Sequence, residues 1–179
     1  MRYPIWMTFA SHTSVAAAKA FRLRFLLGAI AAFGLIALAI GFQHMDNLVP
    51  CPLCIFQRVA YAAAGVLFLI GALLPMRSRG ARRGLAVLTL IPLLTGMGIA
   101  ARHVWLTHLP PDKVPKCGPG LEYLLDSVGA GGMIRSVLTG SGECAKVDWH
   151  LLGLSMPEWS LVGFAALTLW CLLALLRGR

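Results

Sequence analysis

The sequence predicts an all-α membrane protein, a four-helix transmembrane bundle in a single domain. Two observations predict this fold. First, 58% of the 179 residues are hydrophobic and only 13% are charged. Second, the apolar residues gather into four long, nearly uncharged runs, whereas a soluble domain would scatter them over amphipathic elements. We expect one membrane domain over residues 1–179 and no separate soluble domain.

Four apolar runs predict the membrane-spanning helices. They cover residues 25–42, 55–74, 85–101 and 159–176. Each approaches the length of about 20 residues that a helix needs to cross the hydrocarbon core. The Ala-Leu-Ala sequence at residues 37–39 has the small-x-small form of a signal-peptide cleavage site. The first run is longer than the apolar core of a signal peptide, so we favour a retained helix.

The segments that flank the spans differ sharply in charge. Residues 1–24, 75–84 and 177–179 together hold ten Lys or Arg and no acidic residue, whereas all seven acidic residues lie in residues 43–54 and 102–158. Cytoplasmic segments carry an excess of Lys and Arg, so both termini are expected in the cytoplasm and both cysteine-bearing loops outside. The net charge of +9 follows from this topology and gives no reason to expect nucleic-acid binding.

A Cys-Pro-Leu-Cys sequence opens the second span, with Cys51 and Cys54 at its ends. If Cys51 is the helix N-cap, Pro52 occupies the first helical position, where a missing N–H has no cost. Cys54 then lies in the first turn, and Arg58 lies one turn further along the same face. The helix dipole and the guanidinium both favour a thiolate over a thiol, so we expect redox reactivity at Cys54.

Other interpretations of these residues rank below redox chemistry. A structural disulfide at the helix start ranks second. A bridge across only two intervening residues closes a small ring and constrains little of the chain beyond it. Zinc ranks last, and we expect no metal, because no second CxxC pair exists to complete a ligand set. For Arg58, a snorkelling anchor at the membrane boundary and a functional cation both stay open.

The long outer segment carries two more cysteines, Cys117 and Cys144, in a stretch rich in Gly and Pro. Four of the five cysteines therefore lie on the side where disulfides persist, and this even count suits two bridges. A mobile disulfide near a CxxC pair suggests a relay. By spacing alone a purely structural bridge is favoured, since most extracytoplasmic disulfides are structural. Cys171 lies inside the fourth span, where we expect a small buried hydrophobe.

Two further features lie at the outer membrane boundary. Residues 149–159 are aromatic and apolar but too few to cross, which predicts either a piece lying in the interface plane, such as a short interfacial helix, or an aromatic belt leading into the last span. His103 follows Arg102 at the outer end of the third span. A lone histidine there is usually only a polar helix end, so the residue pattern alone assigns it no role.

Taken together, these motifs resemble the bacterial disulfide bond formation protein B (DsbB) family of quinone-linked membrane thiol oxidases. The resemblance rests on Cys-Pro-Leu-Cys-Ile-Phe-Gln-Arg, the four spans, the paired loop cysteines, Gly-Ser-Gly-Glu-Cys-Ala and Leu-Gly-Leu-Ser-Met-Pro-Glu-Trp. It covers about residue 21 to the C-terminus. It implies an inner-membrane protein-dithiol:quinone oxidoreductase that reoxidises a periplasmic DsbA-like thiol oxidase and passes the electrons to quinone, with ubiquinone as the expected quinone.

The resemblance also implies a role for each of four cysteines. Cys117 would receive the thiolate of the DsbA-like partner, which frees Cys144. Cys144 would then exchange with Cys51, so that Cys54 is released as a thiolate beside the quinone. The resting disulfide pairing stays open, and no role is carried onto Cys171.

Two more residues match family positions at the quinone. Arg58 would contact a quinone oxygen, where a guanidinium stabilises both a thiolate and developing negative charge. His103 matches a histidine near the quinone site. Two alternatives remain: a non-catalytic membrane subunit whose disulfides only stabilise the outer loops, and a quinol-driven disulfide reductase. The first predicts that serine at Cys54 or Cys117 lowers abundance and not activity; the second predicts reduction of a partner disulfide.

Overall fold

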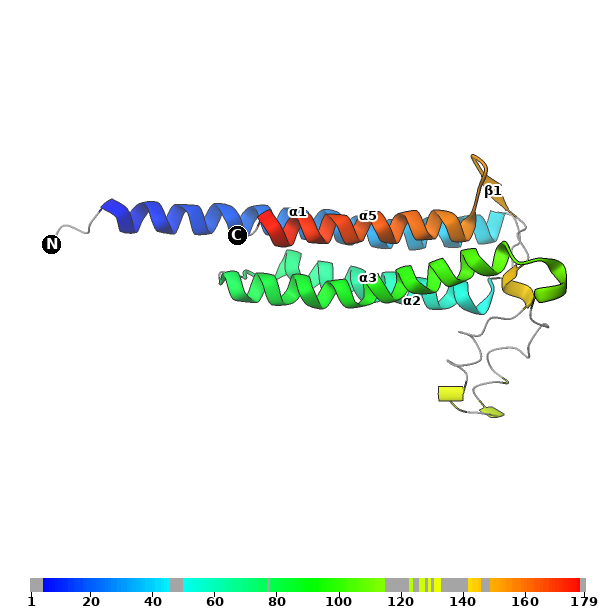
Figure 1. The fold of residues 1–179 in the computed structure, drawn as a ribbon. Helices are drawn as coiled ribbons and strands as arrows, with labels where there is room; N and C mark the ends of the chain where they lie inside the picture. Colours follow the sequence, from blue (N-terminus) through cyan, green and yellow to red (C-terminus); the bar gives the residue numbers. More distant parts are fainter. Residues whose placement is uncertain are drawn as a thin grey trace.

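The computed structural model describes residues 5–45, 50–76, 78–114, 123, 126–127, 129, 131–132, 142–145 and 149–177. Its long helices are α1 (Ile5–Met45), α2 (Pro52–Leu73), α3 (Arg79–Thr107) and α5 (Met156–Arg177). All four are long and apolar enough to cross a membrane. They lie side by side along one axis, with the C-terminus at one end of the bundle and the hairpin at the other (Figure 1). The predicted all-α four-helix membrane fold is confirmed.

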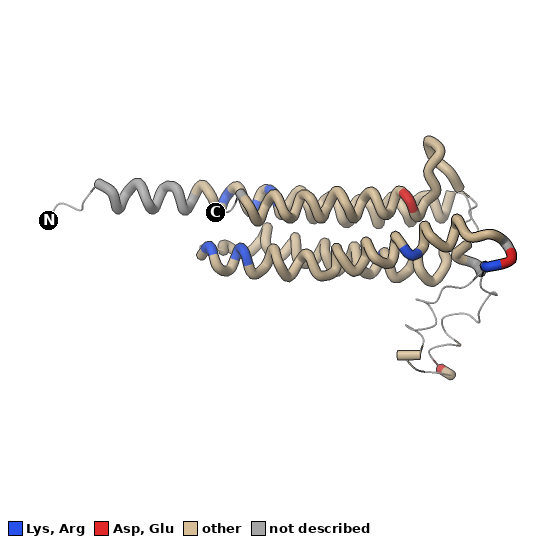
Figure 2. The backbone as a smooth tube through the Cα atoms, in the orientation of Figure 1, with Lys and Arg blue, Asp and Glu red and all other residues tan. Residues whose placement is uncertain are grey.

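The helices extend past the predicted spans at both ends of α1, α3 and α5 and at the start of α2. The physical reason is that an apolar run gives only the part of a helix that lies in the hydrocarbon core. The backbone hydrogen bonds of the helix can continue into the polar residues on either side. The described Lys and Arg gather mostly at the end that holds the C-terminus, and the described acidic residues lie at the other end (Figure 2).

Short elements occupy the cysteine-bearing end of the bundle. Two 3-10 helices, η1 (Pro111–Lys113) and η2 (Gly142–Ala145), precede an antiparallel hairpin of β1 (His150–Leu151) and β2 (Leu154–Ser155). The structure thus places a hairpin, and then the first turn of α5, where an interfacial piece or an aromatic belt was expected over residues 149–159. The turn of the hairpin is Leu152-Gly153, both with positive φ, and the Leu152 side chain is 86% exposed.

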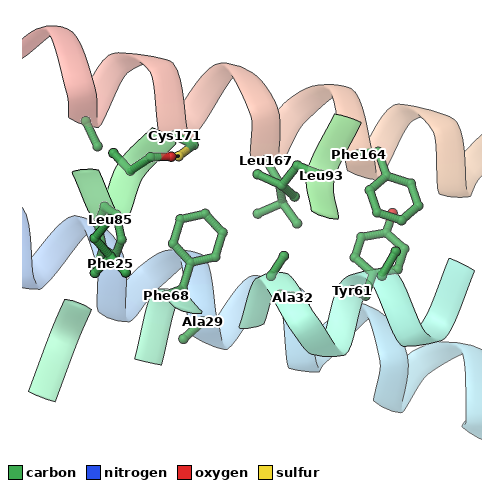
Figure 3. Packing of buried hydrophobic residues seen from close by; sticks show 14 of the residues in the cluster. Phe25, Ala29, Ala32, Tyr61, Phe68, Leu85, Leu93, Phe164, Leu167 and Cys171 are labelled. Atoms are coloured by element: carbon green, nitrogen blue, oxygen red, sulfur yellow. Dashed lines mark hydrogen bonds between the residues drawn. The ribbon is translucent and has the colours of Figure 1, made fainter. Parts of the chain in front are cut away.

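The core of the bundle is built from aromatic rings set against small residues of neighbouring helices (Figure 3). The Tyr61 ring of α2 stacks on the Phe164 ring of α5 with centroids 3.8 Å apart, and its hydroxyl donates to the Ser160 carbonyl at 2.8 Å. A Cβ at Gly96 of α3 would lie 2.3 Å from the Phe164 ring, so only glycine permits this approach. Cys171 is fully buried in the same core, as predicted.

Candidate functional site

The site begins at the first turn of α2. Cys51 is the N-cap in an extended conformation, Pro52 opens the helix, and the Cys51 sulfur accepts a hydrogen bond from the Cys54 backbone N–H at 3.3 Å. This confirms the predicted local geometry. The Cys51 thiol also donates to the Cys54 sulfur at 3.0 Å. The Cys54 sulfur is thus placed to accept a hydrogen bond from the thiol of its partner.

The two sulfurs have different surroundings. Cys54 lines a cavity between α1, α2 and the start of α5. Cys51 packs instead against a small buried cluster that includes Leu53 of α2, Leu106 of α3 and Cys144 of η2. The two sulfurs of this pair therefore face different surroundings, the cavity for Cys54 and the buried cluster for Cys51.

Cys144 lies beside Cys51 although the two are far apart in the sequence. Its side chain is 1% exposed, and the Cys51 thiol hydrogen-bonds with it. That hydrogen bond, a second one with Cys54 and burial all raise the pKa of the Cys51 thiol above its ordinary value. The arrangement brings the sulfur of the long outer loop to the CxxC pair, as a relay between the two loops requires.

His103 lies beneath this contact, inside α3. Its Nε2 nitrogen is 3.7 Å from the Cys51 sulfur and 3.1 Å from the Cys144 backbone oxygen. Its Nδ1 nitrogen is 3.1 Å from the side-chain nitrogen of Gln57, one turn after Cys54 on α2. Unlike Gln57, His103 does not line the cavity.

The cavity has a volume of 220 Å³ and mostly apolar walls. Apolar walls come from α1, the hairpin region and the start of α5, and include Leu35, Leu38, Phe42, Trp149 and Trp159. The α2 wall contributes Cys54, Gln57, Arg58 and Tyr61. As their four-residue spacing predicts, Cys54 and Arg58 face the same space.

Arg58 bonds within the protein. One guanidinium nitrogen donates to the Gln43 side-chain oxygen at 2.6 Å, and the other donates to the Ala39 carbonyl at 3.4 Å. Both acceptors belong to α1, on the opposite wall of the cavity. These contacts hold the charged group of Arg58 at the cavity wall, and both the functional and the anchoring interpretation stay predictions.

Ligand atoms of Cys51, Cys54 and His103 lie within 4.8 Å of one another and could hold a metal ion. From the sequence, only the two thiols were considered as metal ligands, and His103 was not included among them. In the structure the His103 nitrogen nearest the sulfurs bonds the Cys144 carbonyl, and the Cys51 thiol bonds the Cys54 sulfur, so all three groups already have hydrogen-bond partners. The absence of a metal stays a prediction.

The structure therefore brings together most of the residues singled out from the sequence. Cys51, Cys54, Cys144 and His103 meet at one end of the bundle, and Arg58 lies on the adjoining cavity. Cys117 lies outside the described residues, as does any bridge that it forms.

Sequence reasoning missed the roles of Gln57 and Gln43. Each is a polar residue inside or at the end of an apolar span, and that is a signal for function in a membrane helix.

Four helices long and apolar enough to span a membrane, with a dithiol at the end of one of them and a third cysteine packed beside it, fit a multi-pass membrane protein with a cluster of thiols at one end of the bundle. The family model for "Disulfide bond formation protein DsbB" matches residues 21–174. The chain belongs to this family, and it is a disulfide-forming oxidoreductase.

Relatives called disulfide bond formation protein B agree with this assignment. The protein from Xanthomonas oryzae pv. oryzae strain MAFF 311018 is 52% identical over 159 residues, which cover 89% of this chain and 92% of that one. The protein from Xanthomonas campestris pv. campestris strain 8004 is 50% identical over the same length and shares. That from Acinetobacter baumannii strain ATCC 17978 is 50% identical over 139 residues, 78% of this chain and 81% of the relative.

Proposed function

We propose that the protein reoxidises a periplasmic DsbA-like thiol oxidase and passes the electrons to a membrane quinone, with ubiquinone as the expected acceptor. The observation that carries this proposal is the division of surroundings within the CxxC pair. Cys51 touches the sulfur that would deliver electrons, and Cys54 faces the cavity that would receive them.

In the proposed sequence of exchanges, each thiolate attacks one sulfur of a disulfide and displaces the other. The partner's thiolate attacks Cys117 of a Cys117–Cys144 bridge, and Cys144 leaves as a thiolate. Cys144 attacks Cys51 of the Cys51–Cys54 bridge, and Cys54 leaves as a thiolate. The second thiol of the partner then displaces Cys117 as a thiolate and completes the partner's disulfide. Cys117 attacks Cys144, which re-forms the Cys117–Cys144 bridge and releases Cys51 as a thiolate. Cys51 and Cys54 would then re-form their own bridge, and the two electrons released would pass to the bound quinone.

The cavity supports a quinone ring as the acceptor. A cavity of roughly 150 Å³ holds a benzene ring, so a volume of 220 Å³ suits a ring with small substituents. Its apolar walls suit a lipid-soluble molecule, while Arg58 offers N–H donors to a carbonyl oxygen. When bound, the quinone supplies an acceptor for two electrons and two protons. His103, matched to the quinone site by family resemblance, would act there indirectly through Gln57, which bonds its ring and lines the cavity.

We further propose an inner-membrane location with both termini in the cytoplasm and the cysteines in the periplasm. Most of the described Lys and Arg lie at the end of the bundle opposite the described acidic residues, and this asymmetry supports the orientation (Figure 2). A membrane-impermeant thiol reagent added to intact spheroplasts should label reduced Cys117. Labelling only after the membrane is opened would reverse the proposed topology.

The experiment that tests the proposed reaction uses purified protein, a reduced DsbA-like partner and a soluble ubiquinone analogue. We expect equal amounts of partner disulfide and quinol to form. Serine at Cys54 or at Cys117 should abolish turnover and leave the amount of membrane-inserted protein unchanged.

Cys171→Ser is the matched control, because this cysteine is buried in the core, away from the cavity, and serine keeps a donor to the Ala86 carbonyl. Turnover that persists in Cys54→Ser, or a partner disulfide that becomes reduced when quinol is supplied and is never formed with quinone, would refute the proposal. Equal loss of activity in Cys171→Ser would mean that the assay reports folding.

A further inference from the structure

Gln57 is a buried amide for which the proposed thiol exchanges have no direct use. Its side chain is 4% exposed and sits inside the apolar helix α2. Burying an amide without a hydrogen-bond partner is costly, so the partner of this side chain is a guide to its role. That partner is the ring of His103 on α3, itself 3% exposed.

The contacts of the His103 ring fix its tautomer. The Cys144 backbone oxygen can only accept a hydrogen bond, so the ring nitrogen 3.1 Å away, Nε2, must carry a proton. In the neutral ring Nδ1 is then an acceptor, and the Gln57 amide nitrogen 3.1 Å from it is the donor. The hydrogen bonds therefore run in one direction, from Gln57 through His103 to the Cys144 carbonyl.

This chain of hydrogen bonds ends at the residue that must meet the CxxC pair. Cys144 belongs to a 3-10 helix of four residues, which packs against α3. The ring that bonds its carbonyl also lies 3.7 Å from the Cys51 sulfur. One side chain thus touches both partners of the exchange.

We propose that Gln57 and His103 are positioning residues that hold Cys144 within reach of Cys51 for thiol–disulfide exchange. The inference rests on the proposed function and deepens it. Gln57 orients the His103 ring, and the ring clamps the backbone of Cys144. Neither residue exchanges electrons or takes a proton in this role.

The test measures how readily Cys51 and Cys144 form a disulfide, in the full-length protein with serine at Cys54 and Cys117. In a glutathione buffer, the two thiols and one glutathione disulfide give the Cys51–Cys144 bridge and two reduced glutathiones. The equilibrium constant, read by alkylation and mass spectrometry, reports the effective concentration of one thiol at the other. The assay contains neither quinone nor partner, so its outcome is independent of whether the proposed electron transfer is correct.

We expect His103→Leu and Gln57→Leu each to lower this constant by about tenfold, the effect of one net hydrogen bond. Combining the two should give no more than the His103→Leu effect, because both break the same chain. His103→Gln keeps an N–H donor for the Cys144 carbonyl, so its equilibrium constant should be close to that of the protein with His103. Adding Gln57→Leu to His103→Gln should then cause no further fall in the constant. A purely structural role would show neither rescue nor coupling.

Thr89→Val is the matched control, since Thr89 is fully buried on the same helix as His103 and, among the described residues, its hydroxyl donates within its own helix to the Leu85 carbonyl at 2.8 Å. The proposal is overturned if Gln57→Leu changes the equilibrium constant no more than Thr89→Val does. It is also overturned if the fold-changes of His103→Leu and Gln57→Leu simply multiply in the double variant. A His103→Leu variant that fails to fold leaves Gln57→Leu and His103→Gln to decide the question.

Discussion

Replacing Gln43 should weaken quinone use without touching the cavity wall. Gln43 does not line the cavity, but its side-chain oxygen accepts the 2.6 Å hydrogen bond from Arg58. Hydrogen bonds to a charged group contribute about 1.5–3 kcal/mol. Arg58 is only partly buried and keeps its bond to the Ala39 carbonyl, so the lower value applies. Gln43→Leu should therefore raise the KM for a soluble quinone by about tenfold.

Two kinetic measurements separate this effect from general damage. Steady-state turnover at varied quinone concentration gives the KM, and a single turnover without quinone gives the rate at which the reduced partner delivers electrons. Only the first should change in Gln43→Leu. His44→Ala is the control, since His44 is the next residue along α1 and is exposed. An unchanged KM, or an equal loss in the single-turnover rate, would show that Gln43 does not act through Arg58.

Three further predictions follow from contacts in the bundle and at its outer end. The Cys144 side chain is the main cause of the raised pKa of Cys51, so Cys144→Ala should lower that pKa. The rate of alkylation of Cys51 in the reduced protein should then rise at a lower pH than in the unmodified protein. An unshifted pH profile contradicts the contact. Gly96→Ala should destabilise the detergent-solubilised protein by about 1–3 kcal/mol, because the added methyl meets the Phe164 ring; thermal unfolding checks this, and an unchanged midpoint contradicts it. Leu152→Gly should leave the midpoint equal or higher, because glycine suits a φ of 54° better than leucine does, and a lower midpoint would show that the exposed side chain is itself stabilising.

The parts of the fold that depend on local pattern could be predicted from the sequence. Apolar length gave the four helices, and the Cys-Pro pair gave the N-cap and first residue of α2, because a proline at that position forgoes no hydrogen bond. The hairpin could not be predicted in the same way. Its turn places Leu152 at positive φ, which few leucines adopt, and only Gly153 signalled a break.

The parts of the candidate site that depend on contacts between helices could not be predicted from the sequence. Gln57 and His103 are 46 residues apart, and Gln43 and Arg58 are 15 apart, so no periodicity relates them. Each polar residue could be recognised as unusual in an apolar span, but its partner is decided by how the helices pack. The position of His103 against Cys51 and Cys144 was likewise invisible before the fold placed α3 beside α2.

The cap at Cys51 affects how variants of this protein should be designed. Its sulfur secures the first turn of α2 through the Cys54 backbone N–H, besides any chemistry that it performs. Serine keeps an acceptor at that position, whereas alanine removes it and costs about 1 kcal/mol of helix stability. An alanine scan would therefore confuse fraying of a helix end with loss of a reactive group, while a serine scan keeps the two apart.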